Sequence, residues 1–459
     1  MAQIENKTID EIQVGDSCFL ERRLTRDDIH LFAIMSGDVN PAHLDDDYAQ
    51  KSIFHEVIAH GMWGGALIST VLGTQLPGPG TIYLEQTLKF KRPVTLGDVV
   101  RVTLRVLQKN TENRRVTFEC LCTNQKQEVV ISGEATVLAP SHKISRPVPH
   151  LPEIRMMGQK HWTALLMQVK EMPVVKAVVV HPVSPMALEG VLMAARAGII
   201  DPILVGPKER IRQAAMEANL DMDTLEIIDT PHSHASASRA VSMARQGDVQ
   251  TVINGSLPVK ELFQAVLHPE TGLRTDKRAS HVFAYDVPTY DKMIYITDAG
   301  ITPFPTLENK RDIIQNAIDL VWRVAHVPPK VAILAASDEI SAALPSTIDA
   351  ATLCKMAERN QIKGGILDGP LAFDSAISPS AAKYSKLNSP VAGQADILVA
   401  PDLESAHLLA KQLEHLADAK GAGIIIGTRV PVILPTHAED AFARMASCAL
   451  ATLMIAKAV

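Results

Sequence analysis

The hydrophobic pattern of the chain changes character near residue 140. Before it, two helical periods at 26–36 and 42–51 are followed by an apolar, glycine-containing run at 61–72. Such a run predicts a buried helix, because it has no polar face for solvent, and its glycines indicate that a sheet approaches closely. Segments in which hydrophobic and polar residues alternate then predict strands with one buried face at residues 100–106, 116–122 and 129–137. The order predicts an α+β arrangement, an antiparallel meander wrapped around a central helix.

Beyond residue 156 short apolar runs alternate with helical periods. Strands are predicted at 176–180, 202–205, 225–228, 251–254, 281–285, 293–297, 331–335, 365–368, 397–400 and 423–426. Helical periods include 307–325, 348–359, 404–418 and 438–456. Several of the strand runs are continuously apolar, which is typical of parallel strands covered on both faces. The pattern predicts a doubly wound α/β region in two lobes.

A polar segment rich in proline separates the two patterns. It contains Pro140, Pro147, Pro149 and Pro152, and it is the best linker candidate in the chain. We therefore expect a first domain at residues 1–139, a linker at 140–155 and a second domain at 156–459.

Composition limits the partners and the cellular compartment. The 459 residues carry a net charge of -6, and the pI of about 6.2 argues against nucleic acid or an anionic membrane surface as the main partner. The five cysteines are sparse and odd in number, so no disulfide framework is expected, and Cys120 and Cys122 are assigned to core packing. No apolar run approaches membrane-spanning length, and the N-terminus lacks the apolar stretch of a signal peptide. These features predict a soluble cytoplasmic protein.

The loop between the first two helices brings together groups that can move protons. Gly37 is suited to end a helix, and Asp38 follows it directly. Asn40 precedes Pro41, which suits the first turn of the next helix, so His43 lies near a helix N-terminus. A neutral imidazole there can accept a proton from water. Taken singly, Asp38 reads as a capping residue and His43 as an interior histidine.

The same stretch resembles the hydratase-2 motif of the MaoC-like enoyl-CoA hydratases. In that motif an aromatic residue precedes Ser-Gly-Asp-x-Asn-Pro-x-His, and a small residue follows six positions later. The matching residues are Phe32, Ser36, Gly37, Asp38, Asn40, Pro41, His43 and Ala49. Further matches lie at residues 58–62, 76–80, 89–93 and 97–98. Ala42 departs from the family, which usually has a larger aliphatic residue there.

This resemblance covers roughly residues 10–138 and implies a hot-dog fold that dimerises. It implies (R)-specific hydration of a trans-2-enoyl-CoA. Asp38 and His43 would activate one water, which attacks the β-carbon while a proton is delivered to the α-carbon. Asn40 would hold the loop, and the N–H of Gly61, at the start of the buried helix, would polarise the thioester carbonyl.

Two polar segments in the second region lie at strand ends. One is the basic turn 272–281, which contains Arg274, Lys277 and Arg278 and reads either as a solvated loop or as an anion site. The other is the small-residue turn 297–301, at the kind of strand edge where open α/β sheets bind ligands. No glycine-rich phosphate loop of the common nucleotide-binding types follows a strand. Two histidines at 232 and 234 have no further ligand nearby in sequence, so no metal site is predicted.

These segments resemble the phosphate acetyl/butyryltransferase family over about residues 160–457. The matching runs are residues 296–300 with Pro305 and Glu308, then 345–351, 367–374 and 389–398. The resemblance implies a two-lobed α/β fold and the reaction of an acyl-CoA with phosphate to give an acyl phosphate and free coenzyme A. Candidate substrate-binding residues are Arg274, Lys277, Arg278, Asp298, Gly300, Asp368 and Gly393. Together the two resemblances imply a homo-oligomer through both domains, with coenzyme A thioesters and inorganic phosphate as substrates and no bound cofactor.

The end of the second region departs from the transferases. Where they carry a Ser-Arg pair followed by a carboxylate, this chain has Thr436, His437 and Asp440. Thr436 keeps a hydroxyl and Asp440 is the candidate base, but His437 lacks the permanent bidentate charge of arginine. The sequence therefore predicts a bifunctional acyl-CoA enzyme. The alternative is a hydratase whose C-terminal region binds acyl-CoA and oligomerises without catalysis.

Overall fold

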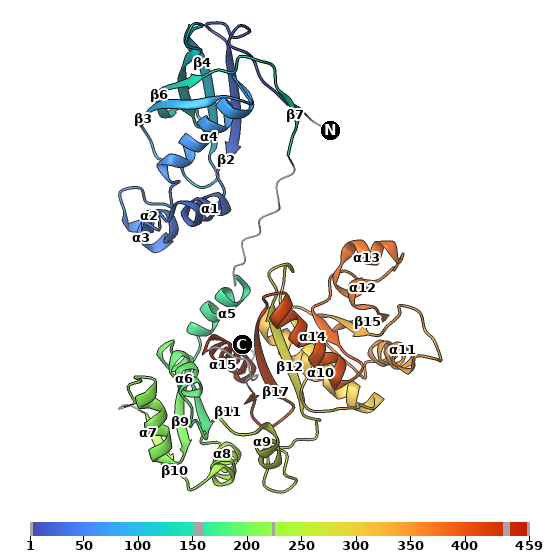
Figure 1. Ribbon diagram of the computed structural model, residues 1–459. Coiled ribbons are helices and arrows are strands. Elements are labelled where there is room, and N and C mark those ends of the chain that lie inside the picture. The colour runs from blue at the N-terminus through green and yellow to red at the C-terminus, as the bar shows by residue number, and fades with distance from the viewer. Residues whose placement is uncertain (1–2, 150–159, 223–224, 435–440, 457–459) are drawn as a thin grey trace. The chain divides into compact units, whose positions relative to one another are not determined.

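The computed structural model describes residues 3–149, 160–222, 225–434 and 441–456. The chain divides into two compact units, Met1–Met156 and Met157–Val459. Each unit is described by itself (Figure 1).

The N-terminal unit is built on a five-stranded antiparallel sheet of strand order β2-β4-β5-β6-β3. Its strands are β2 (Ser17–Arg23), β3 (Ile82–Phe90), β4 (Val99–Asn110), β5 (Arg115–Thr123) and β6 (Val129–Leu138). Helix α4 (Gly61–Thr74) lies against this sheet (Figure 1) and buries Trp63, Ile68 and Val71. A Cβ at Gly64 would lie 2.3 Å from Ile131 Cδ1 on β6, which confirms the close approach predicted from the glycines. The hot-dog expectation of a sheet around a central helix is confirmed.

Alternation along β5 places both of its cysteines in this core. Cys120 and Cys122 are fully buried, as predicted. Burial raises the pKa of each thiol to about 12, so both thiols are protonated near neutral pH.

Three short helices precede α4. Helix α1 (Arg26–Ser36) ends at Gly37, whose φ of 75° is left-handed, and Asn40 caps α2 (Pro41–Leu44). The helix predicted over 42–51 is instead two helices. The backbone of Asp45 leaves the helical region, and its side chain accepts from Tyr48 N to begin α3 (Asp46–Lys51).

The segment expected to be a linker begins inside the N-terminal unit. Strand β7 (Ser145–Pro147) pairs with β1 (Gln3–Glu5), so the chain is held to this unit beyond residue 139. Residues 150–155 of the expected linker lie outside the described residues.

The C-terminal unit contains one eleven-stranded sheet of order β10-β9-β8-β11-β18-β17-β12-β13-β16-β14-β15. The strands are β8 (Val175–Val180), β9 (Ile200–Gly206), β10 (Glu226–Asp229), β11 (Thr251–Asn254), β12 (Ser280–Asp286), β13 (Ile294–Thr297), β14 (Lys330–Leu334), β15 (Ile366–Leu371), β16 (Ile397–Val399), β17 (Lys420–Ile426) and β18 (Val432–Ile433). Every strand predicted from sequence is present, and β18 is an addition.

Helices of this unit pack on either side of the sheet. The first lobe carries α6 (Pro185–Arg196), α7 (Lys208–Glu217), α8 (Ser233–Gln246) and α9 (Val259–Val266), after the leading helix α5 (Lys160–Lys170). The second lobe carries α10 (Leu307–Ala325), α11 (Pro345–Glu358), α12 (Phe373–Ile377), α13 (Pro379–Tyr384) and α14 (Leu403–Leu416). The last helix, α15 (Ala441–Ile455), packs on α5, α6 and β17. The two-lobed α/β expectation is confirmed (Figure 1).

The centre of the sheet is mixed rather than parallel. Strand β12 is buried along its whole length, yet it pairs antiparallel with both β13 and β17. Strand β17 also pairs antiparallel with β18. The other pairs of this sheet are parallel, as in β8 with β9 and β13 with β16.

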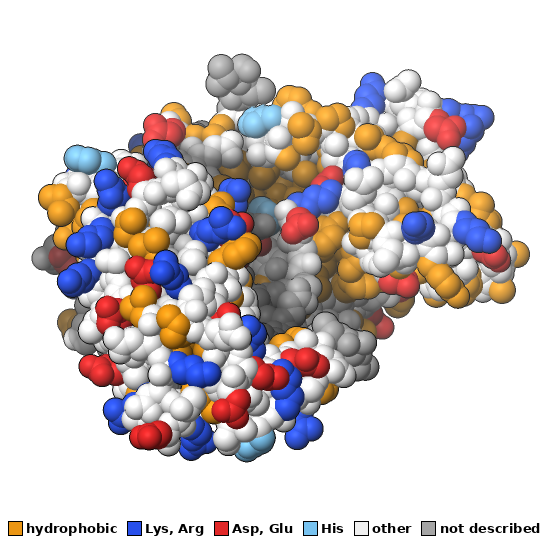
Figure 2. Space-filling model, turned by 90° about the horizontal axis from the view of Figure 1, so that it is seen from above, with side chains coloured by type: hydrophobic (Ala, Val, Ile, Leu, Met, Phe, Trp, Pro, Cys, Tyr) orange, Lys and Arg blue, Asp and Glu red, His pale blue; other side chains and the backbone are white. Residues whose placement is uncertain are grey.

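Charged side chains are intermingled on the face of the molecule that Figure 2 shows. Lysine and arginine alternate with aspartate and glutamate there, and no broad field of one sign is visible among the described residues on that face. No helix within the described ranges is long and apolar enough to cross a membrane.

Candidate functional site

The Asp38 loop is held by its own hydrogen bonds. Asp38 Oδ1 accepts the N–H of Asn40 at 3.2 Å, and Asn40 Oδ1 accepts the N–H of Ala42 at 3.1 Å. The backbone N–H of Asp38 donates to Ser36 Oγ at 3.2 Å. These local bonds orient the carboxylate, which remains exposed to solvent.

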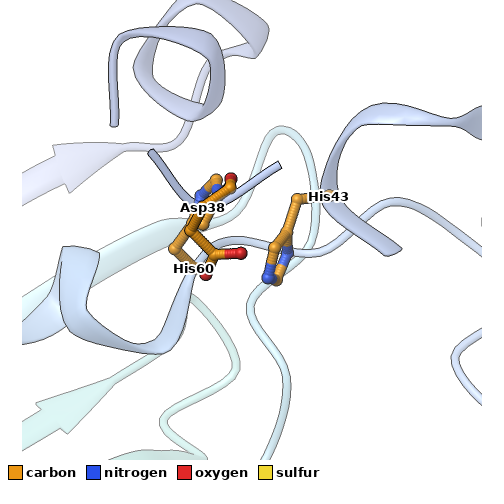
Figure 3. A group of neighbouring side chains, drawn as sticks. All are labelled: Asp38, His43 and His60. Carbon is orange, nitrogen blue, oxygen red and sulfur yellow. The ribbon is translucent and has the colours of Figure 1, made fainter. Parts of the chain in front are cut away.

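His43 is buried behind this loop, and its proton arrangement follows from one contact. Its Nδ1 lies 2.9 Å from the carbonyl oxygen of Ile58. Since a carbonyl only accepts, Nδ1 carries the proton, and Nε2 of the neutral ring keeps a lone pair. The carboxylate of Asp38 points toward this ring in Figure 3. The pair is thus equipped to accept a proton from a water molecule.

A second buried histidine, His60, lies beside the pair, and no role was predicted for it from the sequence. His60 Nε2 lies 3.0 Å from the backbone oxygen of Asp38, and its ring centroid lies 4.0 Å from that of His43. Phe32 contacts the same ring at a centroid distance of 5.0 Å. One donor atom of each of Asp38, His43 and His60 lies within 4.8 Å of the others. The sequence signals for His60 were its place directly before the buried helix and within the matching run 58–62.

The backbone N–H of Gly61 begins helix α4. It is among the first N–H groups of the helix, which have no acceptor within the helix and sit at the positive end of its dipole. A Cβ at Gly61 would lie 3.1 Å from the ring of Phe90, so a glycine suits this position. His60 is the N-cap of α4. The N–H of Gly61, the candidate donor to an oxyanion, therefore directly follows the histidine that contacts the Asp38 loop.

In the C-terminal unit, the basic turn lines a cavity. Its residues 274–279 enclose a volume of about 400 Å³ together with Ile301 and the first turns of α10. Lys277 is already paired with Asp319 at 3.0 Å. Arg274 and Arg278 form no ion pair among the described residues. The two arginines are therefore the groups here that can bind an anion.

Asp298 organises the neighbouring turn. Its carboxylate accepts the backbone N–H of His281, Gly300, Ile301 and Thr302 at 2.9–3.2 Å. Burial raises the pKa of Asp298, while these four donors act in the opposite direction. The hydroxyl of Thr302 in turn accepts Nε of Arg278 at 3.4 Å. Asp298 therefore positions the turn that contacts Arg278, and both of its carboxylate oxygens accept hydrogen bonds from backbone N–H groups.

His281 is the packing partner of that turn. A Cβ at Gly300 would lie 3.0 Å from the His281 ring, so the glycine permits the contact. Burial lowers the pKa of His281 to about 3, so this imidazole is neutral in the folded protein near neutral pH.

The other expected substrate-binding residues lie in the second lobe. Asp368 is on β15, where its Oδ1 accepts the N–H of Gly369 at 2.8 Å. Gly393 has a φ of 77°, and a Cβ there would lie 2.7 Å from Pro379 Cα. Neither residue lines the cavity of the basic turn. Thr436, His437 and Asp440 lie outside the described residues.

Two family models match the chain. Residues 234–451 match the phosphate acetyl/butaryl transferase family, and residues 15–126 match the MaoC like domain. The chain is 51% identical to the phosphate acetyltransferase of Rhizobium meliloti over 280 residues, which cover 61% of this chain and 89% of the relative.

Solved structures are similar to each part. A branched-chain phosphotransacylase from Enterococcus faecalis V583 matches with a TM-score of 0.55 and 25% identity, over 61% of this chain and 99% of that one. The unliganded R-hydratase PhaJ1 from Pseudomonas aeruginosa matches with 46% identity and a TM-score of 0.33, over 34% of this chain and 99% of that one. The chain belongs to the phosphate acetyl/butyryltransferase family and carries a MaoC-like domain ahead of its transferase region.

Proposed function

We propose that the chain is a bifunctional acyl-CoA enzyme. Its N-terminal unit hydrates trans-2-enoyl-CoA to an (R)-3-hydroxyacyl-CoA, and its C-terminal unit exchanges an acyl group between coenzyme A and phosphate. The observation that carries the first activity is the pairing of Asp38 with a His43 whose Nδ1 is fixed as a donor. Membership of the transferase family carries the second.

Hydration would use the two side chains on one water. His43 Nε2 and the Asp38 carboxylate accept hydrogen bonds from it, so that its oxygen attacks the β-carbon as a proton leaves. One of these two side chains, Asp38 or His43, then delivers a proton to the α-carbon. The N–H of Gly61 would stabilise the negative charge that develops on the thioester oxygen. Asn40, as the cap of α2, keeps the loop in place.

Phosphate acyltransfer would use the cavity of the basic turn for the anion. Arg274 and Arg278 bind phosphate, while Lys277 contributes less because Asp319 already neutralises it. Asp298 and Gly300 position the turn beside the two arginines. We propose that Asp368 and Gly393 maintain the local backbone conformation of the second lobe. By the family resemblance, Thr436 supplies a hydroxyl and Asp440 the base that accepts the coenzyme A thiol proton.

Neither reaction is proposed to need a bound cofactor, since all bonds change by addition, elimination or acyl exchange. We also propose a cytoplasmic location, because the five cysteines are free and both substrates are coenzyme A esters or inorganic phosphate.

We propose that the chain is a homo-oligomer through both units. In the N-terminal unit β3 is an edge strand of the sheet, and its Ile82, Leu84 and Phe90 are 56%, 46% and 55% exposed. An apolar edge strand favours pairing with a second copy. Sedimentation velocity of the full chain should give a species of at least a dimer, and a monomer at micromolar concentration would contradict the proposal.

Two assays on the full chain test the function. Crotonyl-CoA should lose its enoyl absorbance and yield the (R)-alcohol. Acetyl-, propionyl- and butyryl-CoA should each be tested for release of free coenzyme A, with and without phosphate. Release that depends on phosphate supports the transferase. A folded protein with no release from any chain length would instead leave the C-terminal unit as an acyl-CoA-binding module, which the histidine at position 437 favours.

A further inference from the structure

The two histidines of the N-terminal site share an arrangement that general acid–base chemistry does not require of both. Each has one ring nitrogen on a backbone carbonyl, His43 Nδ1 on Ile58 and His60 Nε2 on Asp38. In each neutral ring the other nitrogen therefore keeps its lone pair. Histidines that bind metal ions commonly have this arrangement, because the carbonyl fixes the tautomer and the ring orientation.

His60 has no other visible use for its lone pair. The ring is 3% exposed, and its Nδ1 has no hydrogen-bond partner among the described residues. A buried acceptor without a donor is costly, so an unpaired nitrogen at this depth points to a ligand. A carboxylate is the remaining requirement for a cation, and Asp38 supplies it from the exposed side.

We propose that Asp38, His43 and His60 form a binding site for a divalent transition ion of the Zn²⁺ type. The ion is bound by one carboxylate oxygen and two imidazole nitrogens, a mixed donor set that suits zinc and copper better than magnesium. The proposal builds on the proposed hydratase function, because the ion occupies the position of the attacking water. Zinc is therefore a reversible inhibitor of hydration rather than its cofactor.

The geometry requires a small closure of the three groups. Donor atoms around tetrahedral zinc lie about 3.4 Å apart, given bonds of about 2.0–2.1 Å. One donor atom of each residue lies within 4.8 Å of the others, so the three groups must move closer to bind the ion. Asp38 is exposed and can rotate its carboxylate inward, while both rings stay on their carbonyls. The two rings, whose planes are tilted by 35° to one another, then bind the ion through their free nitrogens without bringing two cations together.

Two measurements on the full chain test the site. Calorimetric titration with zinc chloride should find a site of micromolar affinity, and zinc should inhibit crotonyl-CoA hydration over the same range. Excess chelator should restore activity, and magnesium should neither bind nor inhibit. In His60→Gln the affinity for zinc should fall at least about tenfold, the loss typical even for changes to groups that only support a ligand. His43→Gln should lose the same site.

His55→Gln is the matched control, because His55 is an exposed histidine of the same unit. It should bind zinc like the wild type, and near-ultraviolet circular dichroism should show that all three variants are folded. Zinc binding that is absent, or unchanged in both His43→Gln and His60→Gln, would overturn the site. A site that binds zinc and is lost in these variants, in a chain without hydratase activity, would leave the site standing and reject the proposed function.

Discussion

Replacing Asp38 by asparagine should lower the rate of crotonyl-CoA hydration by about 10³-fold, within the range typical for loss of a general acid–base group. The amide has the same shape and can still accept the N–H of Asn40, as Asp38 Oδ1 does at 3.2 Å. It cannot take a proton from water. The loss should therefore appear in kcat, with little change in thermal unfolding, when initial rates are followed by enoyl absorbance.

Asp47→Asn provides the control for this variant. Asp47 is an exposed carboxylate on α3 of the same unit, so its loss should leave hydration unchanged. The phosphate-dependent release of coenzyme A should also persist in Asp38→Asn, because the other unit performs it. Normal hydration by the folded Asp38→Asn chain would refute the assigned role.

Replacing Arg278 by glutamine should lower phosphate-dependent coenzyme A release by about 10- to 100-fold, as expected for losing a charged hydrogen-bond donor to an anion. The guanidinium lines the cavity beside Arg274 and is held by the hydroxyl of Thr302. The effect should appear mainly as a raised KM for phosphate, measured by thiol detection at several phosphate concentrations.

Lys277→Gln is the graded comparison, since Lys277 lies in the same turn but is paired with Asp319. Its effect on the KM for phosphate should be smaller than that of Arg278→Gln. If the two variants behave alike, or if neither alters the KM for phosphate, the anion site does not lie in this turn.

Local chemistry in the sequence predicted the backbone of the Asp38 loop well. A glycine that accepts positive φ, followed by Asn-Pro, determined where α1 ends and α2 begins, and the structure has both boundaries there. The break at Asp45 was not predicted, because the apolar period continues through it and only the side-chain bond to Tyr48 N reveals the new cap. The contact of His60 with this loop was also not predicted. Its partner Asp38 is 22 residues away, and that contact depends on tertiary packing.

Strand positions in the C-terminal unit were predictable, but their directions were not. Burial on both faces makes a strand continuously apolar whether its neighbours are parallel or antiparallel, and β12 is an example of the second case. Strand β18 has two residues, too few to produce any period. Likewise, the sequence pattern does not predict that the carboxylate of Asp298 accepts hydrogen bonds from four backbone N–H groups. Only the folded turn brings those donors within bonding distance.

The order of strands in the large sheet also constrains when the protein can finish folding. Strands β17 and β18 lie between β11 and β12, in the interior of the sheet, although they are the last strands of the described chain. Arg444 of α15 then donates to the backbone oxygen of Asn254, a contact that spans 190 residues. During synthesis on the ribosome, one edge of β11 therefore has no partner strand until residues 420–433 have been made. The sheet of the first lobe cannot be completed before then. The N-terminal unit, whose strand pairs all lie within residues 3–147, has no such delay.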